Sequence, residues 1–190
     1  MGPRARQVVF IFLLLMFCWF LMMAFHELGH VVGAWSTGGQ VRKLVLNPLT
    51  ISRTEVDPNP RPGTVVWMGP ILGSILPAFI SAVVPRKIVA LKKTCNFFAG
   101  FCLIANGAYI SFGVIDEVGD CRQMLKTGSP TWLLVLFGLL SIPTGLWLWH
   151  RLGSVKEFLR DPTAIPDFLT WTIGVLLALY LVAAFAFSPV

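Results

Sequence analysis

Charged side chains are scarce in this sequence. Only 13% of its 190 residues are charged and 56% are hydrophobic, which gives a mean hydropathy of +0.76. A soluble domain carries about a quarter of its residues as charges, so this composition argues against a water-soluble globular protein. The 15 Phe and 7 Trp residues exclude a disordered chain, because disordered segments are poor in aromatic residues.

Two further absences narrow the class of protein. The net charge of +6 comes from cations in short, scattered clusters rather than along one face, which argues against nucleic acid as a partner. The four cysteines form no Cys-x-x-Cys pair and no disulfide framework. The remaining class that fits this composition is an integral membrane protein.

Long apolar runs are abundant instead. From Gln7 to Phe25 no side chain is charged, and about 20 apolar residues are enough for a helix to cross the hydrocarbon core of a bilayer. Further apolar segments lie at about 64–84, 94–115, 132–149 and 168–187. The sequence therefore predicts an all-α, polytopic protein with about five transmembrane helices in the lipid bilayer of the cell membrane.

The first apolar run could be either a cleaved signal peptide or a retained transmembrane helix. Arg4 and Arg6 precede it, as cations precede the apolar part of a signal peptide. No A-x-A-like cleavage site follows, however, and the run leads directly into a polar motif. We therefore expect a helix that is retained in the protein.

The polar motif is His26-Glu27-Leu28-Gly29-His30. Positions i and i+4 of a helix share one face, so the two imidazoles can bind the same metal ion. Zn²⁺ accepts neutral imidazole and keeps an open position when three protein ligands hold it, and Glu27 can then take a proton from zinc-bound water. The alternative is a helix end that has emerged into water. Ionisable residues inside a membrane mark function by default, which favours the metal site.

A catalytic zinc ion needs a third protein ligand. Because successive spans reverse direction, the segments after the first and third spans lie on the same side of the membrane as the two histidines. With Glu27 as the base, the carboxylates on that side are Glu55, Asp57, Asp116, Glu117 and Asp120.

The positions of these carboxylates rank them. Glu55 and Asp57 lie in a proline-rich loop, which is a poor platform for a rigid site. Asp116 and Asp120 are one helical turn apart at the end of the third span. We favour Asp120 as the ligand and keep Asp116 in reserve.

The segment after the first span also holds two short β-prone runs. Val41–Leu46 and Thr50–Thr54 are separated by Asn47-Pro48-Leu49, which predicts a β-hairpin. An exposed hairpin edge can bind an extended peptide through main-chain hydrogen bonds. An ordinary surface hairpin is the equally favoured alternative.

These residues resemble the site-2 proteases, a family of intramembrane zinc metalloproteases. The resemblance rests on His26-Glu27-Leu28-Gly29-His30, on Gly69-Pro70-x-x-Gly73 in the second span and on a carboxylate at the end of the third. It covers roughly residues 8–128. The sequence Gly119-Asp120-Cys121 stands where the family usually has Leu-Asp-Gly, as in a divergent, minimal member.

The resemblance implies a fold and a set of roles. The fold is a metalloprotease core in residues 1–128, with helices at about 7–36, 64–84 and 94–120, followed by two additional helices in 129–190. Within it, His26, His30 and Asp120 would bind Zn²⁺ and Glu27 would be the catalytic base. Asn106 would contact the oxyanion or the substrate. The substrate would be a transmembrane protein that unwinds and pairs with the hairpin.

Two other functions compete with proteolysis. A non-catalytic membrane adaptor could retain a metalloprotease-like fold, and a metal-ion carrier could use the histidine pair as a transit site. A carrier needs ionisable groups along a path across the bilayer, whereas here they cluster at one face. We therefore predict a zinc-dependent intramembrane endopeptidase, with the adaptor as the alternative. The cation distribution mildly favours a cytoplasmic N-terminus, and the resemblance favours the reverse orientation.

Overall fold

The computed structural model describes residues 2–154, 160–161 and 167–188. Within these residues, five helices are long and apolar enough to cross a membrane: α1 (Pro3–Ser36), α2 (Pro62–Val83), α3 (Val89–Asp116), α5 (Thr131–His150) and α7 (Asp167–Phe187). A short helix, α4 (Gly119–Lys126), follows α3, and strands β1 (Val41–Val45) and β2 (Arg53–Val56) follow α1. The predicted helical class, the five membrane-length helices and the hairpin are confirmed.

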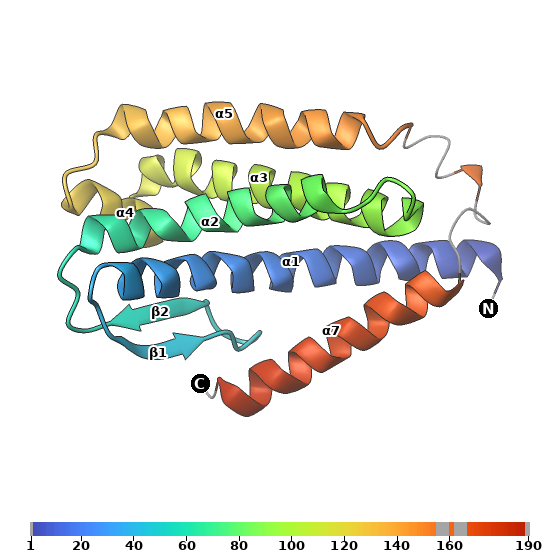
Figure 1. Cartoon of the computed structure of the whole chain (residues 1–190), viewed down its shortest axis with the longest axis horizontal. Coiled ribbons are helices and arrows are strands. Elements are labelled where there is room, and N and C mark those ends of the chain that lie inside the picture. The colour runs from blue at the N-terminus through green and yellow to red at the C-terminus, as the bar shows by residue number, and fades with distance from the viewer. Residues whose placement is uncertain (1, 155–159, 162–166, 189–190) are drawn as a thin grey trace.

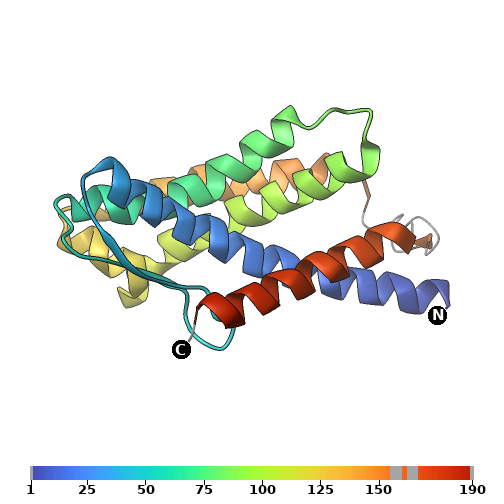
Figure 2. The same cartoon turned by 60° about the horizontal axis from the view of Figure 1, so that its bottom comes forward.

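The long helices run alternately in opposite directions along the molecule (Figure 1). α1 packs against α2, α2 against α3 and α3 against α5, while α7 packs obliquely against α1 (Figure 2). The hairpin and α4 consequently lie at the same end of the bundle, and the connection between α2 and α3 lies at the other end. This is the arrangement that the alternation of spans predicts.

The third helix differs from the sequence prediction of about 94–120. α3 starts at Val89 and ends at Asp116, after which Glu117 and Gly119 have φ values of 47° and 53°. A residue in the left-handed region commonly ends a helix, and here the pair separates α3 from α4. Asp120 therefore belongs to the first turn of α4, and it is not one turn from Asp116 on a continuous helix.

The hairpin is antiparallel and lies beside the end of α1 (Figure 1). Leu44 of β1 pairs with Thr54 of β2, and Val45 pairs with Arg53. The sequence predicts a second strand that starts at Thr50, whereas β2 starts at Arg53. The reason is that residues 47–50 form a turn, in which Asn47 accepts hydrogen bonds from the backbone N–H groups of Leu49 and Thr50.

Glycines allow α3 and α5 to approach closely. A Cβ atom added at Gly145 would lie 2.7 Å from the carbonyl oxygen of Gly100, and one at Gly138 would lie 2.9 Å from that of Gly107. Such contacts leave no room for a methyl group. Membrane helices associate largely through this close packing of small residues, because lipid tails are as apolar as the side chains.

We predict that Gly145→Ala weakens the α3–α5 contact by about 1–3 kcal/mol, since overpacking forces the backbone apart. The variant should therefore unfold at a lower temperature in detergent. Gly174→Ala is the matched control, because its Cβ would lie an ordinary 3.5 Å from Leu13. Equal unfolding temperatures for the two variants would contradict this packing.

Candidate metal centre

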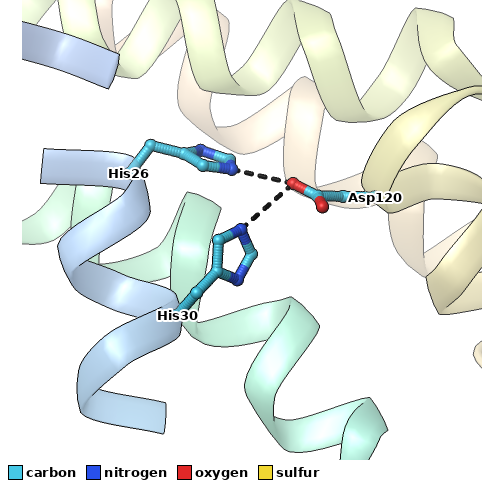
Figure 3. Close-up of side chains that lie close together, drawn as sticks. All are labelled: His26, His30 and Asp120. Carbon is cyan, nitrogen blue, oxygen red and sulfur yellow. Dashed lines mark hydrogen bonds and ion pairs between the residues drawn. The ribbon is translucent and has the colours of Figure 1, made fainter. Parts of the chain in front are cut away.

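Two helices bring His26, His30 and Asp120 together. The histidines lie one turn apart on α1 and point toward the carboxylate in the first turn of α4 (Figure 3). Oδ2 of Asp120 lies 2.7 Å from Nε2 of His26 and 3.4 Å from Nε2 of His30. One ligand atom from each residue lies within 4.8 Å of the other two, so this group could hold a metal ion. Asp116 is exposed at the end of α3 and is not part of the group.

The second nitrogen of each imidazole faces a hydrogen-bond acceptor. Nδ1 of His30 lies 2.9 Å from the carbonyl oxygen of Val65, and Nδ1 of His26 lies 2.7 Å from Oδ1 of Asn106. Each Nδ1 therefore carries a hydrogen, and each Nε2 faces Asp120, where a neutral ring presents a lone pair and a protonated ring presents a hydrogen. Such partners fix the tautomer and the orientation of metal-binding histidines. When both rings are neutral, two lone pairs and a carboxylate repel one another unless a cation lies among them, so the arrangement fits a metal ion.

Asn106 lies behind His26 and is 1% exposed. Its Nδ2 donates a hydrogen bond to the carbonyl oxygen of Cys102 at 3.0 Å, which turns Oδ1 toward the imidazole. Both polar groups of the amide are thus engaged. This position favours a role in orienting His26, while the contact with an oxyanion or a substrate stays a prediction.

Tyr109 and Gly119 fix the position of Asp120. The hydroxyl of Tyr109 accepts the backbone N–H of Asp120 at 3.0 Å. A Cβ atom at Gly119 would lie 2.1 Å from this hydroxyl, and the positive φ of Gly119 also favours glycine. Burial raises the pKa of Asp120, but in the metal-free protein a protonated histidine beside it donates a hydrogen bond and carries a positive charge, and these effects outweigh burial and hold the pKa well below its usual range. Asp120 is therefore an anion at neutral pH.

Cys121 turns away from this group. Its thiol donates to the carbonyl oxygen of Ile110 at 3.2 Å, and burial raises the pKa of the thiol to about 11. Because the thiolate is the form that binds metal, Cys121 is poorly prepared to be a ligand.

The glycines of α1 and α2 let the two helices meet at the histidines. A Cβ atom at Gly69 would lie 2.3 Å from the imidazole of His30, and one at Gly29 would lie 2.2 Å from the carbonyl oxygen of Met68. A Cβ atom at Gly73 would lie 3.2 Å from Cα of His26. The segment Gly69-Pro70-x-x-Gly73 is thus where the α2 backbone packs against the histidine-bearing face of α1.

Glu27 is 3% exposed and follows His26 directly in the chain. Its Oε2 accepts a hydrogen bond of 2.7 Å from the hydroxyl of Thr54 in β2. Glu27, His26, His30 and Asp120 line a cavity of about 860 Å³, whose walls come from α1, α2, α3, α4 and the hairpin. The site therefore combines a group that could hold a metal ion, a buried carboxylate and space for a ligand.

Sequence reasoning missed the roles of Thr54 and Tyr109. Tyr109 lies three residues after Asn106 and so shares its helix face, which is a signal that could have found it. The side chain of Thr54 meets Glu27 only because of the hairpin's register and its placement against α1, neither of which the sequence displays. The chain matches no protein-family profile, no curated protein and no solved structure.

We predict that Asp120→Ala abolishes stoichiometric binding of Zn²⁺, used as the probe ion, by the detergent-purified protein. The loss should exceed the roughly 10–100-fold effect of removing an outer partner of a ligand. Asp116→Ala is the matched control and should bind Zn²⁺ like the wild type. Metal analysis after gel filtration measures both, and the opposite pattern would assign the third ligand to Asp116.

We predict that Asn106→Leu weakens Zn²⁺ binding by about 10–100-fold, because the Nδ1–H of His26 loses its acceptor. Asn106→Asp should retain much of the affinity, since a carboxylate oxygen can still accept this hydrogen. Competition with a chelator of known affinity measures the difference. An unchanged affinity in Asn106→Leu would show that Asn106 does not orient the ligand.

Proposed function

We propose that this chain is a zinc-dependent intramembrane endopeptidase of the site-2 protease type. Its substrates would be transmembrane segments of other membrane proteins, cut in or near the bilayer. The observation that carries the proposal is the meeting of His26, His30 and Asp120 beside the buried Glu27, at the end of an apolar helix. His26, Glu27 and His30 have the His-Glu-x-x-His spacing that is typical of zinc proteases.

The donor set supports zinc as the metal. Two imidazole nitrogens and one carboxylate oxygen are a common catalytic zinc set, whereas Ca²⁺ and Mg²⁺ prefer oxygen ligands. Tetrahedral zinc with ligands at about 2.0–2.2 Å holds its donor atoms about 3.3 Å apart. Asp120 lies 2.7 Å and 3.4 Å from the two histidine nitrogens and the three ligand atoms lie within 4.8 Å of one another, so small side-chain shifts would bring them to this spacing. When bound, zinc supplies Lewis acidity, which polarises a peptide carbonyl and lowers the pKa of a water molecule to about 7.

Glu27 is suited to move the proton during peptide hydrolysis. Its carboxylate lines the cavity next to the ligand His26, and Thr54 engages Oε2 but not Oε1. Glu27 would accept a proton from the attacking water and then give it to the nitrogen of the leaving amine. These two transfers balance, because the peptide gains one hydroxyl and one hydrogen.

The hairpin is suited to hold the substrate. β1 pairs with one edge of β2, which lies beside α1 (Figure 1), and residues 51–56 line the cavity. An extended peptide can add to such a strand through main-chain hydrogen bonds, which requires a substrate helix to unwind first. The hairpin would thereby deliver a peptide bond to the side of the cavity that holds Glu27.

We predict that Glu27→Gln lowers cleavage of a reporter transmembrane substrate by at least about 10²–10⁴-fold, the usual contribution of a general base. Metal content should stay that of the wild type, because Glu27 is not a ligand. Glu117→Gln, at an exposed position after α3, is the matched control and should cleave normally. A wild-type protein that binds zinc but cleaves no reporter would instead favour the non-catalytic adaptor.

A further inference from the structure

Thr54 links the hairpin directly to Glu27. Its hydroxyl lies 2.7 Å from Oε2 of Glu27 and 3.4 Å from the backbone carbonyl oxygen of the same residue. Thr54 itself is partly buried, whereas its strand neighbours Arg53 and Glu55 are each about half exposed and pair with each other. The alternation of side chains along β2 thus turns Thr54 toward α1.

This contact restrains the carboxylate of Glu27. A hydroxyl that donates to a carboxylate forms a short, charge-assisted bond, about twice as strong as a neutral one. Threonine is β-branched, so its own side chain has few rotamers and holds the donor in place. One oxygen of Glu27 is thereby anchored, and the rotation of the carboxylate about its last bond is limited.

The hairpin that carries Thr54 is itself held from its other edge. Ser188, which directly follows α7, accepts the backbone N–H of Leu46 at 2.6 Å and donates to the carbonyl oxygen of Leu44 at 3.3 Å. Leu44 is the residue that pairs with Thr54 across the hairpin. The strand position of Thr54 is therefore fixed on one side by β1 and α7, and on the other side by Glu27.

We propose that Thr54 is a positioning residue, which orients the Glu27 carboxylate and couples the placement of the hairpin to the placement of the base. The inference rests on the proposed function. If β2 holds the substrate, the same strand positions both the substrate peptide and the Glu27 carboxylate that transfers the protons. A loss of the Thr54 hydroxyl should leave substrate binding intact and slow the chemical step.

The test compares three variants in the full-length protein with a reporter transmembrane substrate and bound zinc. Thr54→Val replaces the hydroxyl by a methyl group of similar size, and should lower kcat by about 10-fold or more with KM within about twofold of wild type. Thr54→Ser retains the hydroxyl and should restore kcat to within a few-fold. Thr50→Val is the matched control in the hairpin turn, where the hydroxyl bonds only to Asn47 among the described residues.

Two kinetic results would overturn the proposal. One is an unchanged kcat in Thr54→Val, with or without a raised KM, and the other is equal impairment of Thr54→Val and Thr54→Ser. Zinc content should match the wild type in every variant, so a loss of metal in Thr54→Val would also count against a positioning role.

A readout that does not need activity separates this proposal from the proposed function. Thermal unfolding of Glu27→Gln, Thr54→Val and the double variant forms a double-mutant cycle, and the hydroxyl–carboxylate contact predicts non-additive effects. Additive effects would overturn the contact whether or not the protein is a protease. A wild-type protein without cleavage but with non-additive effects would contradict the proposed function and retain the link between Thr54 and Glu27.

Discussion

Three ionisable side chains meet among apolar helices, and the surrounding structure serves to hold them there. Nε2 of His26 and Nε2 of His30 both face the carboxylate of Asp120, and neutral rings would present lone pairs to it, which is unfavourable away from water unless a cation lies among them. Hydrogen-bond acceptors behind both imidazoles set their tautomers, and glycines in α1 and α2 let the helix backbones come close enough for this contact. A metal ion bound among the three side chains would offset the cost of burying them, and the same features that position the group could hold such an ion.

The order of the helices brings distant segments to this one place. Alternating spans carry the end of α1, the hairpin and α4 to the same end of the bundle (Figure 1). The face of α1 that carries both histidines therefore meets Asp120, which is 90 residues further along the chain than His30. The hairpin meets Glu27 on the neighbouring face through Thr54. Residues 26–30 of α1 are thus contacted from two sides, by Asp120 of α4 and by Thr54 of the hairpin. In the proposed mechanism, proton transfer and peptide binding would depend on both contacts.

Much of this could be predicted from residue patterns, and the remainder depends on backbone geometry. Apolar runs predict the five membrane-length helices, the i, i+4 spacing places both histidines on one face, and the alternation of spans restricts the third ligand to five carboxylates. The choice of Asp120 over Asp116 depends on the break at Glu117 and Gly119, whose φ values no residue pattern specifies. The hydrogen bonds of Asn106 and Thr54 require the register of α3 and of the hairpin against α1, which is a tertiary property.

X-ray absorption at the zinc edge of the zinc-loaded, detergent-purified wild-type protein tests the central claim most directly. Ligation by His26, His30 and Asp120 predicts nitrogen and oxygen neighbours at about 2.0–2.2 Å, with the outer-shell scattering of two imidazoles. A sulfur neighbour at about 2.3 Å would assign a cysteine such as Cys121 to the site and contradict this ligand set. Failure of the protein to retain zinc would contradict the metal centre itself.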